Sequence, residues 1–378
     1  MRLTGPLFLT AAARGFGASC PFSPCTQVPL STPPLAIRGL QPPPLEGVFD
    51  PSVQPTGDPA APFALVFSAV EATANISTRA ALYDPTASAW VFAGDVNEAG
   101  PPAQRPCGGG PCLAALVHEV PSLLFDPFDA NPSRRWKVFT HTYLITDATT
   151  LHYDWGNINL FTAGSPSGPW AREALLGWRG ASPLSSNVSQ VLTDFPQLAD
   201  CVAFTEPGAA VDAASRTLLL ALGCVSVGPA GAEIRVVLLS SSSSGARWAY
   251  NGMAVDGADA ARLGYAVPQL DAADLLWAPP PAGGGPPQLL LSVTPAAELW
   301  PGFTGYAGCI ILRVLADFSG VERAAGGAPE VVRAIVPAST AFAGACAAAP
   351  GAPGGWLMPT LFPAQAAAFQ ILPSGVAA

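Results

Sequence analysis

Two acidic residues that precede proline are the positions in this chain best suited to acid–base chemistry. Asp50 precedes Pro51 and Glu206 precedes Pro207, and each pair heads a short apolar segment predicted as a strand. A carboxylate can give or take a proton when it lies within hydrogen-bond reach of a reacting group. Glu206 follows Phe204 in a largely apolar stretch, where burial would favour the protonated form. Asp before Pro is also a common turn starter, so both pairs have a purely structural explanation as well.

A third step of this kind carries no acid. Val120 precedes Pro121, and the polar residues beside it are His118 and Glu119. Because a shift of one residue turns a strand side chain to the opposite face, only a β-bulge would bring Glu119 back to the face of the other acids. His118 and Glu119 therefore remain candidates beside a plain strand start, and Asp274, which heads a later strand, is a candidate for a further carboxylate.

An internal repeat must position these residues. Each unit begins with a short apolar strand, passes a turn rich in Pro, Gly or Asp, and continues into a very hydrophobic strand; the units recur about every 50 to 75 residues. The hydrophobic strands of the first four units read FALVFSA from residue 63, WKVFTHTYL from 136, LLLALGC from 218 and LLLSVTP from 289. The fifth unit is assigned to GWLMPTLF and AAFQILPSG near the end of the chain.

This repeat predicts an all-β fold, a five-bladed β-propeller of four-stranded antiparallel blades. The 42 Pro and 38 Gly are spread along the chain, which suits many short strands and argues against long helices. A β-sandwich or a twisted pair of barrels is the alternative. We expect a leader at residues 1–20, a Pro-rich N-terminal arm at 21–46 and a single propeller domain at 47–378.

With the units in register, the DPS sequence at Asp50 and the EPG sequence at Glu206 resemble those of the five-bladed propeller glycosidases. The resemblance is to glycoside hydrolase family 43 and its relatives that process fructans and mannosides. It implies that inner-strand heads share one central funnel, with Asp50 as base and Glu206 as acid of an inverting hydrolysis. In family 43 the second unit carries an Asp before Pro, where this chain has Val120. Trp155 and Trp300 stand in predicted loops and could stack on sugar rings.

Eight cysteines and the N-terminal residues indicate export. An apolar stretch at residues 3–13 follows Arg2, and the triplet GAS precedes Cys20, which resembles a secretory signal ending in a bacterial lipobox with a lipid on Cys20. Disulfides persist in oxidising compartments. The spacing suggests three pairings without fixing them: Cys107 with Cys112, Cys201 with Cys224, and Cys309 with Cys346.

Composition narrows the classes of partner. The net charge of −9 disfavours nucleic acid, because binding to phosphate backbones needs clustered Lys and Arg. No uninterrupted apolar run is long enough to span a bilayer. With only three His, and with Cys spacing too wide for a zinc knuckle, we expect no metal and no cofactor.

Two functions of different classes remain. One is a monomeric, secreted or cell-surface enzyme that hydrolyses plant or microbial glycans. The other is a non-catalytic propeller that binds glycan or protein at the cell surface. The separation of the Asp50 and Glu206 carboxyls discriminates between them, because the two acids of a glycosidase must flank one sugar ring.

Overall fold

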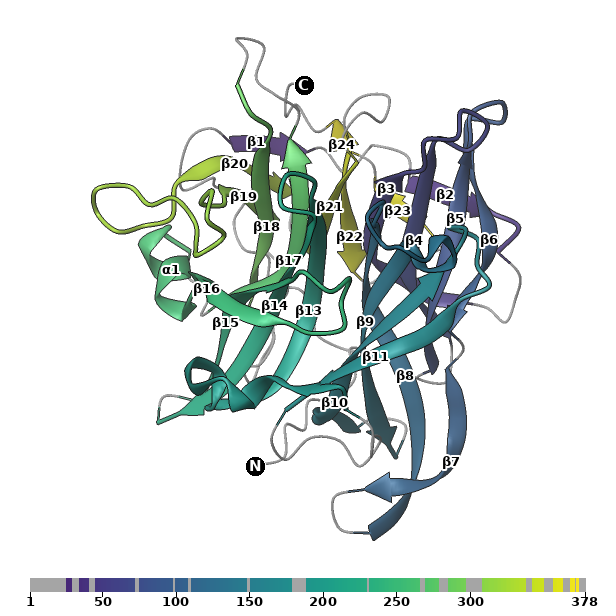
Figure 1. Cartoon of the computed structure of the whole chain (residues 1–378), viewed down its shortest axis with the longest axis horizontal. Coiled ribbons are helices and arrows are strands. Elements are labelled where there is room, and N and C mark those ends of the chain that lie inside the picture. The colour runs from purple at the N-terminus through teal and green to yellow at the C-terminus, as the bar shows by residue number, and fades with distance from the viewer. Residues whose placement is uncertain are drawn as a thin grey trace.

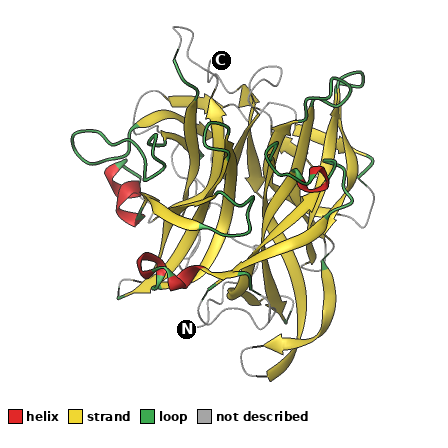
Figure 2. Ribbon diagram, in the orientation of Figure 1, coloured by secondary structure: helices red, strands yellow, loops and turns green. Residues whose placement is uncertain are grey.

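The computed structural model of the chain consists mainly of β-strands (Figures 1 and 2). It describes residues 25–28, 34–40, 45–71, 75–97, 99–107, 110–147, 150–178, 188–229, 231–265, 269–278, 285–296, 308–337, 342–349, 356–362, 368–370 and 372–373. Within them, the helical segments are η1 (Pro132–Arg134), η2 (Leu192–Asp194), η3 (Pro196–Leu198) and α1 (Gly257–Arg262). The all-β prediction is confirmed. No helix of the described part is long and apolar enough to cross a membrane.

The described strands form five sheets, in which consecutive strands pair mostly antiparallel. Sheet one contains β3 (Leu45–Pro55), β4 (Phe63–Glu71), β5 (Asn75–Asp84) and β6 (Ala89–Asn97), then β2 (Pro34–Arg38) and β23 (Ala368–Gln370). Sheet two contains β7 (Gly100–Cys107), β8 (Gly110–Phe125), β9 (Trp136–Thr146), β10 (Thr150–Ala163), β11 (Ala171–Gly177) and β12 (Gln190–Val191). Sheet three contains β13 (Cys201–Asp212), β14 (Thr217–Gly228), β15 (Gly231–Ser241) and β16 (Ala249–Val255).

Sheets four and five complete the described part. Sheet four contains β17 (Gln269–Ala278), β18 (Gln288–Ala296), β19 (Cys309–Arg313), β20 (Val331–Pro337) and β1 (Cys25–Val28). Sheet five contains β21 (Phe342–Ala349), β22 (Trp356–Phe362) and β24 (Leu372–Pro373). The N-terminal segment thus adds parallel edge strands to two sheets, β1 beside β20 and β2 beside β6.

The first strands of the five sheets contact one another in a closed cycle. β3 packs against β8, β8 against β13, β13 against β17, β17 against β21, and β21 returns to β3. Strands far apart in sequence therefore share one centre, around which the sheets are arranged (Figure 1). Residues at equivalent places on these strands come together whatever their separation along the chain.

The core lies between neighbouring sheets, which explains the unbroken hydrophobic runs of the sequence. In β4, Leu65 and Phe67 belong to one buried cluster, while Ala64 and Val66 belong to another that they share with sheet two. A strand covered on both faces needs apolar side chains at every position, not at alternate ones. The run FALVFSA is therefore typical of a strand packed between two other layers.

Three disulfides occur in the described part, and they are the three pairs suggested by the spacing. Cys107 bonds Cys112, Cys201 bonds Cys224, and Cys309 bonds Cys346. Residues 1–20, Trp300 and the arm between the N-terminal strands lie outside the described residues, so the predictions made there stay predictions.

The fifth unit differs from its prediction. Its first strand is β21, with the sequence FAGACAAA, and Trp356–Phe362 forms the second strand, β22, of the same sheet. The segment AAFQILPSG divides, since β23 pairs with β2 of sheet one and β24 pairs with β22. An Ala-rich strand contrasts little in hydropathy with the Ala-rich loops around it, so the repeat could not be aligned there.

Candidate functional site

The same backbone irregularity recurs in the first strand of four sheets. Asp50, Val120, Glu206 and Ala272 have positive φ angles of 50°, 52°, 52° and 51°. In each strand the ladder register shifts at this point, as expected of a β-bulge. In three of them the next residue is Pro, which has no N–H to give to the ladder and is tolerated at bulges. Because the bulge also occurs at Val and Ala, it belongs to the architecture and not to the acids alone.

Hydrogen bonds between neighbouring sheets fix these bulges. Ser52, two residues after Asp50, accepts a hydrogen bond at Oγ from the Leu123 N–H (3.0 Å), and Ser122 accepts one from the Ala209 N–H (2.8 Å). Both serines are buried. The same contact thus joins sheet one to sheet two and sheet two to sheet three, and it holds the strand heads at a common level.

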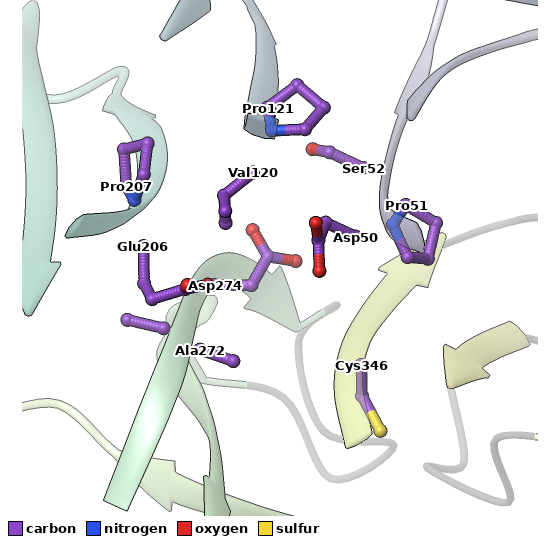
Figure 3. Close-up of a pocket in the computed structure, with 11 residues that line it drawn as sticks. Asp50, Pro51, Ser52, Val120, Pro121, Glu206, Pro207, Ala272, Asp274 and Cys346 are labelled. Atoms are coloured by element: carbon purple, nitrogen blue, oxygen red, sulfur yellow. The ribbon is translucent and has the colours of Figure 1, made fainter. Parts of the chain in front are cut away.

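The bulges bring three carboxylates to one pocket. Asp50 of β3, Glu206 of β13 and Asp274 of β17 line a cavity of about 280 Å³ at the centre of the strand cycle. Val120 and Pro121 of β8, together with Cys346 of β21, complete much of its wall. Figure 3 shows the Asp274 carboxylate pointing into the pocket, between Asp50 and Glu206 and below Val120. Three of the residues predicted from sequence therefore lie together.

Two hydrogen bonds orient the predicted acids. The Ser68 hydroxyl donates to Asp50 Oδ2 (3.0 Å) and accepts from the Val120 N–H (2.8 Å), so it links the bulges of sheets one and two. The Thr205 hydroxyl donates to Glu206 Oε1 (3.3 Å), and Glu206 is buried with 7% of its surface exposed. Ser68 was not predicted as a site residue. It is the one polar residue of the run FALVFSA, and that contrast is the signal that could have found it.

His118 and Glu119 are not brought to the pocket. The bulge at this strand turns Val120, not Glu119, toward the centre. Glu119 instead lies beside the buried phenol of Tyr143. The His118 imidazole is buried, with Nδ1 2.7 Å from Thr142 Oγ1 and its ring edge-on to Phe161. The bulge that sequence reasoning invoked for Glu119 therefore exists, but it acts one residue later.

Trp155 also lies away from the described pocket. It is half-buried at a bulge in β10 and stacks on His152, with ring centroids 3.8 Å apart and an interplanar angle of 6°. Its ring is therefore used within sheet two. Trp300 lies outside the described residues. In the described part of the chain, no group of three or more His, Cys, Asp or Glu is placed to hold a metal ion.

Two buried histidines predict acid sensitivity of the fold. Burial lowers the pKa of His118 to about 3, helped by Arg172 and Arg105, and burial lowers the pKa of His141 to about 3. The unfolded chain, with ordinary pKa values near 6.5, then binds more protons as the pH falls. We expect the free energy of unfolding to fall below pH 6.5 by up to about 1.4 kcal/mol per pH unit for each histidine.

Chemical denaturation between pH 6.5 and about 4.8 measures this slope, because carboxyls with lowered pKa values such as Asp129 and Asp259 titrate at lower pH. The His118→Asn variant is expected to reduce the slope, since an amide there needs no proton. An unchanged slope in this variant would show that His118 is not the sensitive group.

A glycine next to the pocket predicts a second measurable effect. A Cβ on Gly208 would lie 2.5 Å from the Ala273 carbonyl oxygen and 2.6 Å from Asp274 Cα, both backbone atoms of β17. We expect Gly208→Ala to lower the free energy of unfolding by about 1–3 kcal/mol, because the two strands must separate. Gly228→Ala is the matched control, since nothing lies within 4 Å of its Cβ position. Equal stability of the two variants in thermal or urea unfolding would contradict this account.

Comparison with solved structures gives the fold. A GH32 β-fructofuranosidase from Bombyx mori is similar over 90% of this chain and 61% of its own, with 10% identity and a TM-score of 0.51. An exo-β-1,3-galactanase from Phanerochaete chrysosporium matches over 86% and 60%, with 10% identity and a TM-score of 0.48. An endo-arabinase from Bacteroides thetaiotaomicron matches over 92% and 96%, with 12% identity and a TM-score of 0.46.

These similarities confirm the resemblance in fold to propeller glycoside hydrolases. The chain spans about three fifths of the length of the first two of these proteins. No protein-family model matches the sequence, and no curated protein matches it.

Proposed function

We propose that this chain is a five-bladed β-propeller that hydrolyses glycans with two carboxylates at its centre. The observation that carries the proposal is the common pocket of Asp50 and Glu206, which come from strands of different sheets. The closed cycle of five first strands supports the blade count. Convergence of acids on one pocket is what a reaction on a sugar ring requires.

In this proposal Glu206 is the general acid and Asp50 the general base of an inverting hydrolysis. Glu206 protonates the glycosidic oxygen, so that the bond to the anomeric carbon can break. Asp50 takes a proton from a water molecule, which attacks that carbon from the other face of the ring. The surroundings suit these roles, since Glu206 is buried and Asp50 accepts a hydrogen bond from Ser68.

A non-catalytic propeller that binds glycan or protein is the alternative function. It is favoured by the apolar residues at the two remaining bulges, Val120 and Ala272, which leave the second sheet without an acid. Such a protein would bind sugar at the pocket without turning it over. The two functions share the fold and differ in the reaction alone.

A screen of oligosaccharides tests the proposal directly. Purified protein is incubated with arabino-, xylo-, fructo- and galacto-oligosaccharides, and products are followed by chromatography. Hydrolysis that is lost in the Asp50→Asn and Glu206→Gln variants supports the enzyme, and NMR of the released anomer gives the stereochemistry. Saturable binding of a glycan without cleavage would support the alternative and overturn the enzyme.

The proposed setting is outside the cytoplasm. Three disulfides suit an oxidising compartment. We propose a secreted or cell-surface monomer, with Cys20 as a lipid attachment site. Mass spectrometry of the exported protein would detect the lipid on its N-terminal peptide, and an unmodified N-terminus at another residue would exclude it.

A further inference from the structure

The charge of the central pocket is unbalanced among the residues that line it. Asp50, Glu206 and Asp274 are its three ionisable side chains, and the other described lining residues are Pro, Ala, Val, Ser and Cys. No Lys, Arg or His lines this described pocket. Whatever hydrogen bonds the carboxylates accept, a ligand in the pocket meets a wall that carries only negative charge.

Asp274 reaches this pocket from a position that other sheets use differently. It lies two residues after the bulge of β17, as Ser52 and Ser122 do in β3 and β8. Those serines bond to the backbone of the next sheet, whereas Figure 3 shows Asp274 pointing into the pocket. Gly208 stands at the same place in β13 and has no side chain, so β17 can approach closely.

The third carboxylate is not required by hydrolysis. An inverting reaction uses one protonated acid and one ionised base, and these roles are already given to Glu206 and Asp50. A further carboxylate nearby raises the negative potential of the pocket, and the low polarity of the other lining residues strengthens its effect on a ligand. The charge of Asp274 therefore acts on the choice of ligand.

We propose that the pocket selects sugar rings by charge and that Asp274 is the residue that sets this selectivity. The pocket takes a ring with a protonated amine in preference to its uncharged counterpart, and it excludes rings that carry a carboxylate or a sulfate. As a statement about a sugar substrate this rests on the proposed function. As a statement about the potential at the pocket it does not.

A reporter thiol measures the potential without any need for activity. Val120→Cys places a thiol in the pocket wall, and Ala272→Cys provides a second reporter. Each is reacted with 2-trimethylammonioethyl and with 2-sulfonatoethyl methanethiosulfonate, and labelling of its own peptide is followed by mass spectrometry. The ratio of the two rates removes differences in thiol reactivity. Val227→Cys, with 40% of the native side chain exposed on β14, gives the reference ratio for an open surface.

We expect the cationic reagent to be favoured at least tenfold more at residue 120 than at residue 227. Adding Asp274→Asn should reduce that preference severalfold, while Asp194→Asn, which removes an exposed carboxylate of η2, should leave it unchanged. The proposal is overturned by a ratio equal to the reference, by resistance of both pocket thiols to both reagents, or by an equal effect of the two Asn variants.

Matched sugars then test the substrate class. Oligomers of glucosamine, glucose and glucuronate differ mainly in charge, and their binding to wild type and Asp274→Asn is measured by calorimetry. We expect binding to decrease in that order and the differences to narrow in the variant. Equal or tighter binding of the glucuronate oligomer would overturn charge selection. Charge selection without any cleavage would leave this inference standing and remove the proposed hydrolysis.

Discussion

Glu206→Gln and Asp50→Asn are each expected to lower kcat for hydrolysis of an oligosaccharide by about 10²–10⁴-fold, the usual contribution of general acid–base catalysis. Gln and Asn keep the shape of the side chains but can neither hold nor accept the transferred proton. Glu330→Gln is the control for the same chemical change, because Glu330 is exposed and lies in the loop before β20. The three variants should have the same unfolding temperature to within a few degrees.

The two roles can be told apart by the leaving group. An aryl glycoside with 4-nitrophenol as leaving group needs little protonation, so Glu206→Gln should be impaired much less on it than on an oligosaccharide. Asp50→Asn should be impaired equally on both, because activation of water is still required. If both variants respond alike to the leaving group, the assignment of acid and base is wrong. If both retain full activity, neither residue is catalytic.

Lys137→Met is expected to lower the free energy of unfolding by about 3–5 kcal/mol, because it leaves buried carboxylates without their cation. Lys137 has no exposed surface, and its Nζ lies 2.6 Å from Asp129 Oδ2 and 3.6 Å from Asp126 Oδ2. It also donates to the Arg134 carbonyl oxygen (2.9 Å). This network fixes the turn that leads from β8 into β9, and urea denaturation of the variant measures its contribution.

Two further variants show that the cost in Lys137→Met comes from unpaired charge. Adding Asp126→Asn and Asp129→Asn should recover part of the lost stability, since neutral amides tolerate burial better than lone carboxylates. Glu322→Gln breaks a more exposed pair with Arg313 and should change stability by about 1 kcal/mol or less. A Lys137→Met variant as stable as Glu322→Gln would show that the buried network contributes little.

The fold could be predicted from the sequence wherever the repeat was strongly apolar. The runs at residues 63, 136, 218 and 289 correspond to β4, β9, β14 and β18, each packed between two layers. The prediction failed at β21, where Ala replaces the large aliphatic residues that make a buried strand recognisable. It also could not show that β1 and β2 would join sheets four and one, because edge pairing depends on contacts far apart in the chain.

The candidate site was predictable in its acids but not in its geometry. Asp50 and Glu206 could be found because an acid before Pro recurs at unit starts. His118 and Glu119 were misplaced by one step, since a strand of regular pleat and a bulged strand present different residues and the sequence does not locate a bulge. Ser68 and Gly208 act on backbone atoms of neighbouring sheets, and such contacts exist only after the sheets have assembled.

The recurring bulge makes the centre of this molecule interchangeable in its chemistry. Four strands offer one side chain each from the same left-handed backbone position, and the supporting Pro and Ser residues do not depend on what that side chain is. An acid can therefore be lost, as at Val120, without a change in the path of the chain. A lineage built on this scaffold can pass from catalyst to receptor and back by single substitutions, while its architecture stays under separate selection.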